Sequence, residues 1–187
     1  MAKNKKVTLA TLEPSEAARV LERLIAAHPE FRGEAEEIAR SVLGTVSFDS
    51  IADEVEDALR GFDLDDLNQR AGPHSWGYTE PSEAAWETLE EALEPFLEDM
   101  KRHLKLGLEA EALEICKGIL LGLYQVRNET EDEFLGWAPD FPADKAGHVL
   151  ADWIAGGKRP AFPRDFVKQY LPEWPRICEK AERKRAK

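Results

Sequence analysis

The fold is decided by the stretch PSEAAWETLEEALEPFLEDMKRHLKLGLEAEALEICKGILLGLYQV, residues 81–126. Its first half repeats apolar side chains at the spacing of one helical face, with members Ala85, Trp86, Leu89, Ala92, Leu93, Phe96, Met100 and Leu104. Glutamates occupy the opposite face. Residues 109–126 are apolar around most of the helix, which is typical of a central helix. We therefore predict two long adjacent helices at the centre of the fold.

Two features inside this stretch bear on how the helices pack. Pro95 lacks a backbone N–H and crowds the carbonyl of Glu91, so it predicts a kink or a break, and the unbroken apolar pattern favours the kink. Gly118 and Gly122 lie one turn apart on the second helix. Each costs roughly 1 kcal/mol of helix propensity relative to alanine. We expect the close approach of a neighbouring helix to compensate for this cost.

The sequence before this stretch predicts further amphipathic helices. Apolar residues 17–25 follow Pro14, and a second apolar pattern over residues 35–46 follows Gly33. The short link at His28-Pro29 would let these two helices close as an antiparallel pair. A third helix, capped by Ser47 or Ser50, extends to about residue 62, and a capped single turn follows at residues 63–67.

The complete pattern predicts a single all-α domain over residues 1–187, with stacked antiparallel helical hairpins, about seven helices and no sheet. Residues 10–70 and 80–127 form the two hairpin groups. Residues 134–187 form C-terminal helices that wrap the body, and the four prolines from Pro160 to Pro175 allow only short helices in the last part. The hexapeptide at Glu13–Ala18 recurs at Glu80–Ala85, and both copies open a helix. Whether this echo marks a true repeat stays open, because proline and acidic residues open many unrelated helices.

Composition limits the classes of partner. The chain is 43% hydrophobic and 33% charged, with a formal net charge of −12. No apolar run is long enough for a membrane span, and the basic start has no secretory core behind it, so we expect a soluble cytoplasmic protein without membrane contact. The negative charge disfavours nucleic acid. The exception is the basic tail, with Lys180, Arg183, Lys184, Arg185 and Lys187.

No residue pattern indicates catalysis, a cofactor or a metal site. His28, His74, His103 and His148 lack a second ligand at metal spacing. The glutamates of residues 83–98 lack the Glu-x-x-His partner of bundle metal sites. Glycine-rich phosphate loops and an exposed serine nucleophile are also missing. Cys116 lies in an apolar helix and is expected in the core. We therefore predict no catalytic, cofactor-binding or metal-binding residues.

Two aromatic loops remain as candidates for an interaction surface. They cover residues 72–78 and 134–141 and combine aromatic rings with glycine or proline. Because tryptophan and tyrosine are common at binding hot spots, the candidate residues are His74, Trp76, Tyr78, Trp137 and Phe141. The alternative is that these rings only plug the ends of helix pairs.

Three segments resemble helical regions of uncharacterised bacterial proteins, some of which carry a SWIM-type zinc finger. The segments are EPSEAAW to LEPFLED at residues 80–99, GILLGLY at 118–124 and WAPDFP at 137–142. The zinc-binding Cys-x-Cys and Cys-x-His pairs of that finger are missing from this chain. The resemblance therefore implies a bacterial, repeat-like helical scaffold and carries over neither zinc nor DNA binding.

These observations favour a non-catalytic protein-interaction module or scaffold, whose partner is another protein or a second copy of the chain. The alternative is an accessory protein associated with nucleic acid through the basic tail. An enzyme with an unrecognised site ranks third, since no catalytic arrangement supports it.

Overall fold

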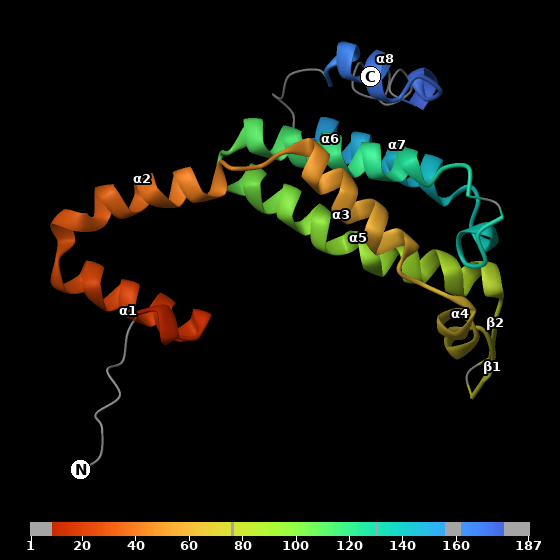
Figure 1. Ribbon diagram of the computed structural model, residues 1–187, viewed down its shortest axis with the longest axis horizontal. Helices are drawn as coiled ribbons and strands as arrows, with labels where there is room; N and C mark the ends of the chain where they lie inside the picture. Colours follow the sequence, from red (N-terminus) through yellow and green to blue (C-terminus); the bar gives the residue numbers. More distant parts are fainter. Residues whose placement is uncertain (1–8, 76, 130, 156–161, 178–187) are drawn as a thin grey trace. The chain divides into compact units, whose positions relative to one another are not determined.

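The computed structural model describes residues 9–75, 77–129, 131–155 and 162–177 of the 187-residue chain (Figure 1). These residues form an all-α protein apart from one short hairpin of strands. The chain divides into two compact units, residues 1–45 and residues 46–187, where the sequence led us to expect one domain. The division falls inside the predicted 10–70 hairpin group, so only its first two helices belong to the first unit.

The first unit contains two helices joined by a tight turn. Its elements are η1 (Leu9–Thr11), α1 (Pro14–Ala27), η2 (Pro29–Phe31) and α2 (Arg32–Leu43). Pro14 takes the first helical position, as predicted, and the backbone N–H of Glu13 donates to the Glu16 carboxylate at 3.0 Å. Gly33 was expected to lie before the second helix, but it lies inside α2. None of the described residues of this unit is buried.

The second unit contains the remaining elements. They are α3 (Phe48–Arg60), α4 (Leu64–Arg70), β1 (Gly72–His74), β2 (Gly77–Thr79), α5 (Pro81–Lys105), α6 (Glu109–Gln125), η3 (Leu135–Trp137), α7 (Phe141–Ala155) and α8 (Arg164–Tyr170). Asp63 caps α4, since its carboxylate accepts from the backbone N–H groups of Asp65 and Asp66 at 2.8 and 3.1 Å. The predicted single turn is therefore a short helix.

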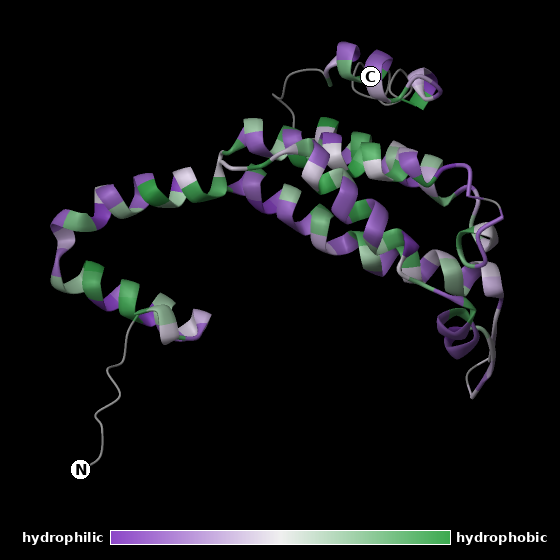
Figure 2. Ribbon diagram, viewed as in Figure 1, coloured by the Kyte–Doolittle hydropathy of each residue, from purple (hydrophilic) through white to green (hydrophobic). Residues whose placement is uncertain are grey.

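Helix α6 lies at the centre of the second unit, as predicted. It packs against α3, α5 and α7, and Figure 2 shows that its ribbon is predominantly hydrophobic. Its fully buried side chains include Ile115, Cys116, Ile119 and Leu120. The buried position of Cys116 also agrees with the prediction. Because α3 is its most extensive neighbour, the core joins residues that we had assigned to two separate hairpin groups.

The glycine pair of α6 faces α3, and the predicted close approach is confirmed. A Cβ atom at Gly118 would lie 2.5 Å from the Cβ of Ile51 and 2.8 Å from the backbone oxygen of Phe48. A Cβ atom at Gly122 would lie 2.6 Å from Cγ1 of Val55. All three distances are far below van der Waals contact, so only glycine lets the two backbones come this close.

Helix α5 passes through Pro95 without a break. Pro95 is exposed, and the residues two positions before and after it, Leu93 and Leu97, are buried. The carbonyl that loses its helical donor therefore lies toward solvent, where water can satisfy it. This position explains why one long helix tolerates an internal proline, and it rules out the predicted alternative of a break.

The prediction of no sheet is wrong at residues 72–79. Strands β1 and β2 pair antiparallel, with Gly72 opposite Thr79 and His74 opposite Gly77. Gly72 and Gly77 have φ values of +105° and +152°, which side-chain-bearing residues rarely adopt. We had treated these glycines as loop punctuation, whereas they allow the chain to reverse tightly enough for two three-residue strands.

Helix α8 and the residues after it contact α3 and α6, as predicted for a wrapping segment. The ring of Phe48 lies 5.3 Å from that of Phe166, in an edge-to-face arrangement. Tyr124 makes the same kind of contact with Trp174 at 5.1 Å. The sequence also predicts a short helix from Trp174 through Ile177, and residues 175–177 are helical. Gly156 and Gly157 are predicted to end α7, and both lie outside the described residues.

An ion pair between Glu90 and Lys145 links α5 to α7. The hydrogen bond from Lys145 lowers the pKa of the Glu90 carboxyl below its ordinary value of 4.5, and burial opposes this effect more weakly. A carboxyl with a lowered folded-state pKa stabilises the fold above its ordinary pKa, and this contribution disappears as the pH falls through the folded-state pKa.

We expect Lys145→Met to reduce the loss of stability between about pH 5 and pH 3, because the variant removes the pair that acid would otherwise break. Urea unfolding at several pH values measures this dependence. Lys101→Met is the matched control, since Lys101 lies 3.9 Å from Glu94 in an exposed pair. Identical pH profiles for the Lys145→Met variant and the unmodified chain would contradict the assignment.

Candidate functional site

The predicted aromatic surface is partly formed, at the end of the second unit where α5 begins. Tyr78 on β2 is 61% exposed and Trp137 in η3 is 46% exposed. Strand β2 ends two residues before α5, and η3 packs on α5, so both segments lie at the same end of that helix (Figure 1). His74 accompanies them, with Nε2 2.9 Å from the backbone oxygen of Arg70. Trp76 lies outside the described residues.

Phe141 does not belong to this surface, and its prediction as a surface residue is wrong. Its side chain is fully buried, and its ring packs edge-to-face on that of Trp86 at 5.1 Å. Phe134, in the same loop, is also buried and contacts the ring of Phe62. For these two rings, the alternative interpretation as plugs of the helix ends is correct.

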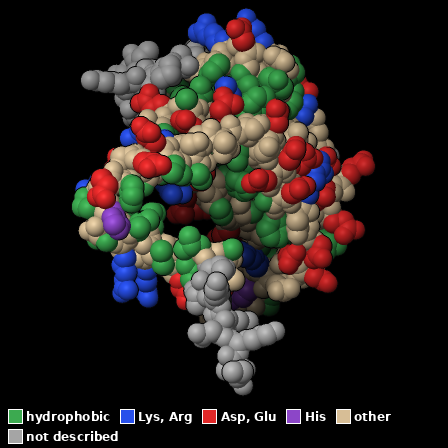
Figure 3. Space-filling model, turned by 60° about the vertical axis from the view of Figure 1, so that its left-hand side comes forward, with side chains coloured by type: hydrophobic (Ala, Val, Ile, Leu, Met, Phe, Trp, Pro, Cys, Tyr) green, Lys and Arg blue, Asp and Glu red, His purple; other side chains and the backbone are tan. Residues whose placement is uncertain are grey.

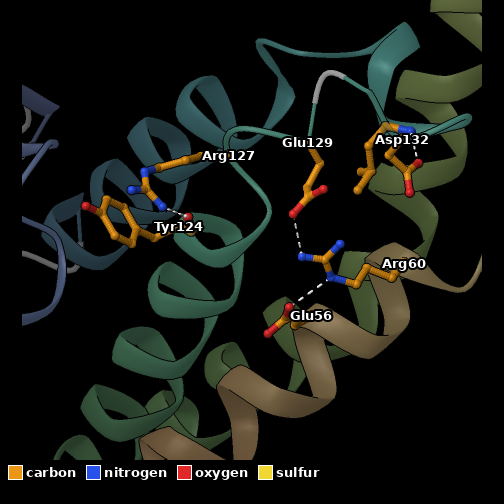
Figure 4. Close-up of polar contacts among 7 residues, drawn as sticks. Glu56, Arg60, Tyr124, Arg127, Glu129 and Asp132 are labelled. Carbon is orange, nitrogen blue, oxygen red and sulfur yellow. Dashed lines mark hydrogen bonds and ion pairs between the residues drawn. The ribbon is translucent and has the colours of Figure 1, made fainter.

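Arg60 fixes the segment that leads from α6 to η3. Its guanidinium group donates to Glu56 on its own helix and to Glu129 in the segment, each at 2.8 Å (Figure 4). These two hydrogen bonds raise the pKa of Arg60 above its ordinary value. Asp132 then accepts from the backbone N–H groups of Phe134 and Leu135 at 2.9 and 2.8 Å. The polar contacts therefore position the start of the aromatic loop.

Arg127, at the start of the same segment, makes a second set of polar contacts. It donates to the Tyr124 carbonyl at 2.7 Å, and its guanidinium carbon lies 3.6 Å from the centre of the Tyr124 ring (Figure 4). Its Nη2 and Nε atoms also donate hydrogen bonds to the Glu173 carboxylate, at 2.6 and 3.1 Å. The hydrogen bonds between the two side chains raise the pKa of Arg127 and lower that of Glu173. Because Arg60 and Arg127 are both engaged by carboxylates, we assign them to structure and not to anion binding.

In the described part of the chain, no group of three or more His, Cys, Asp or Glu residues is placed to hold a metal ion. His103 is buried, with Nδ1 2.9 Å from the backbone oxygen of Asp99, and its Nε2 has no hydrogen-bond partner among the described residues. His103 lies in the last turn of α5, and its burial was not predicted from the sequence.

An open depression of about 540 Å³ lies along the second half of α5. Three acidic and three basic side chains line it: Glu94, Glu98, Asp99, Lys101, Arg102 and Lys105. Two of the cations already pair with acids in the depression, Lys101 with Glu94 at 3.9 Å and Arg102 with Asp99 at 3.8 Å. The balanced charges favour a solvated surface over a site for a charged ligand.

A second apolar surface was missed by the sequence analysis, which assigned its residues to a closed hairpin. It lies on the first unit, and we call it the α1–α2 stripe. Its members are all exposed: Val20, Leu21, Leu24, Phe31, Ile38 and Val42. Figure 2 shows hydrophobic and hydrophilic positions alternating along both helices, and Figure 3, with this side turned forward, shows hydrophobic side chains at the surface.

The α1–α2 stripe is the largest group of exposed apolar residues among the described residues. Ile38 and Val42 are 57% and 68% exposed, although they lie one turn apart on one helical face. Exposed apolar residues are ordinary when scattered, but contiguous ones mark interaction sites. A signal for this role was present in the sequence, because residues 1–45 contain only amphipathic helices and no helix apolar enough to be central.

Comparison of the chain with protein-family models, with curated proteins and with solved structures finds no significant match. The resemblance to helical regions of SWIM-type proteins therefore stays a prediction. In the described residues, no helix is both long and apolar enough to cross a membrane. The basic tail, residues 180–187, lies outside the described residues.

Proposed function

We propose that this protein is a non-catalytic protein-interaction module that binds its partner through the α1–α2 stripe. One observation carries the proposal: the first unit exposes seven large apolar side chains, six of them in the α1–α2 stripe, and buries none of its described residues. Such a surface is costly to leave in water, at roughly 25 cal/mol for each Å². A protein partner that covers it would recover this free energy.

The second unit serves in this proposal as a stable support with a core of its own. That core includes fully buried residues from α3, α5, α6 and α7, such as Val55, Leu89, Leu120 and Trp153. Tyr78 and Trp137 add a smaller exposed aromatic surface at its end. The scaffold-like architecture and the cytoplasmic location that the sequence predicts are part of the same proposal.

A pull-down with the full chain as saturating bait tests the proposal. We expect the unmodified chain to recover a defined protein, either a different protein or added tagged copies of itself. Leu24→Glu should abolish the recovery, because a partner would have to bury an unpaired carboxylate. Leu106→Glu is the matched control, since Leu106 is an exposed leucine of the second unit. Recovery of the same proteins by the Leu24→Glu bait would refute the α1–α2 stripe as the binding surface.

A further inference from the structure

We propose that the first unit is in a helix–coil equilibrium in the free chain, in which α1 and α2 unfold and refold while the second unit stays folded. This equilibrium is a property of the free chain and goes beyond the proposed function. One consequence rests on that function: a protein that covers the α1–α2 stripe would complete both helices, so that folding accompanies binding.

Almost nothing in the first unit is withdrawn from water. Of the described residues 9–45, only Leu12, Ile25, Ala35 and Leu43 are partly buried, and all the others are exposed. Most helical stability in proteins comes from packing an apolar face, and regions with few buried apolar contacts open at little cost in free energy. The first unit therefore lacks the interactions that normally hold helices in a fold.

The two helices do not supply this packing to each other. Both contact the turn η2 that joins them, but α1 and α2 share no extensive contact among the described residues. Leu21 and Leu24 on α1 stay exposed, as do Ile38 and Val42 on α2. Because these apolar faces remain in water, closing the turn stabilises neither helix appreciably.

Helix α3 shows what packing provides at a similar length. Helices α1, α2 and α3 contain 14, 12 and 13 residues, and isolated helices this short are marginal in water. Helix α3 buries Ala52, Val55 and Leu59, and α6 packs along it. Since α1 and α2 bury none of their residues, their length leaves the helical and unfolded states close in free energy.

Local interactions keep the helical state populated without fixing it. Glu13 and Glu16 form a capping box at the start of α1. Helix α2 has no side-chain hydrogen bond at its N-cap, Phe31. The ion pair between Arg40 and Glu36 is long, at 4.0 Å, and exposed, so it contributes little. The helical state of the first unit therefore competes with the unfolded chain without strongly exceeding it.

The positions of the tryptophans allow the two units to be followed separately in the full chain. All five belong to the second unit: Trp76, Trp86, Trp137, Trp153 and Trp174. We expect far-UV circular dichroism to lose helical signal at urea concentrations that leave the tryptophan fluorescence unchanged, because the first unit has no core of its own. Coincident transitions would mean that the chain unfolds in one step and would overturn the equilibrium.

A matched pair of glycine substitutions gives a more specific measurement. Glu37 in α2 and Glu54 in α3 are both exposed and lie in the middle of helices of similar length. Glu37→Gly should lower the helix–coil equilibrium constant of α2 roughly threefold, so the native far-UV ellipticity should fall. Glu54→Gly should leave this native signal unchanged, because packing on α6 holds α3. Tryptophan fluorescence verifies that both variants keep a folded second unit. Equal native ellipticity of the two variants would overturn the equilibrium.

Hydrogen exchange of the unmodified chain locates the equilibrium along the sequence. We expect the amides of α1 and α2 to exchange less than roughly tenfold more slowly than those of an unstructured chain, and those of α6 more than roughly a thousandfold more slowly. Greater slowing in α1 and α2 would mean that the first unit is firmly folded and would overturn the equilibrium.

These results are distinguishable from a failure of the proposed function. A firmly folded first unit whose Leu24→Glu variant loses a protein partner would overturn the equilibrium and leave the interaction module standing. A helix–coil equilibrium in a chain that recovers no protein in the pull-down would support the equilibrium and refute the interaction module.

Discussion

Gly122→Ala is expected to destabilise the protein by about 2 kcal/mol, although alanine is the better helix former. The new Cβ atom would lie 2.6 Å from Cγ1 of Val55 and 2.8 Å from the backbone oxygen of Ala52. Neither atom is the end of a flexible chain, so α3 and α6 must move apart. Overpacking of this kind costs about 3 kcal/mol at the upper end of its range, and the gain in helix propensity returns about 1 kcal/mol.

Gly147→Ala is the matched control for this prediction. Gly147 also lies inside a helix of the second unit, but a Cβ atom there would meet only Cγ2 of Ile177, at 4.0 Å. This substitution should therefore stabilise the protein by up to about 1 kcal/mol. Urea unfolding at constant m-value measures both changes. If both variants gained stability, the close approach of α3 and α6 would be wrong.

The central packing was predictable from the sequence because its signals are local and strong. Residues 109–126 are apolar on nearly every side, and only a central position can bury such a helix. Gly118 and Gly122 indicated a close neighbour for the same reason, since their cost in helix propensity requires compensation. The sequence did not indicate which helix would be that neighbour. Helical periodicity shows which face of a helix is apolar, but it does not show which helix covers that face. We therefore assigned α3 to the 10–70 hairpin group and α6 to the 80–127 group.

The predicted site was only partly right for a related reason. Tyr78 and Phe141 have similar local surroundings, because each lies beside glycine or proline at the start of a helix. Tyr78 lies on a strand of a two-stranded hairpin and is largely exposed. Phe141 begins α7, which packs against α6 and places the ring on Trp86. The difference arises from tertiary packing, and no local pattern contains it.

The first unit shows the opposite error. The apolar spacing of α1 and α2 was correctly assigned to two helices, and their apolar faces were then assumed to be buried against each other. Amphipathicity indicates that a face needs a partner, but it does not say whether that partner belongs to the same chain. The exposed Ile38 and Val42 show that these apolar faces are not buried against each other within the first unit.

Phe141→Ala should destabilise the protein by about 3 to 5 kcal/mol, the usual range for removing a fully buried phenylalanine ring. The ring has no exposed surface, and its edge-to-face contact with Trp86 joins the first turn of α7 to α5. Such a contact adds about 1 kcal/mol to the burial of the ring itself. The variant would leave a cavity between two helices whose backbones are held in place by α6, so the site can collapse only partly.

Tyr78→Ala is the control variant for this prediction. Tyr78 was predicted for the same surface but is 61% exposed, so its removal should change the free energy of unfolding by no more than about 0.5 kcal/mol. Urea unfolding of the two variants measures both values. A loss below about 1 kcal/mol for Phe141→Ala would mean that the ring is accessible and could bind a partner. The expected separation of the two values instead assigns Phe141 to the core and leaves Tyr78, with Trp137, as the aromatic surface of the second unit.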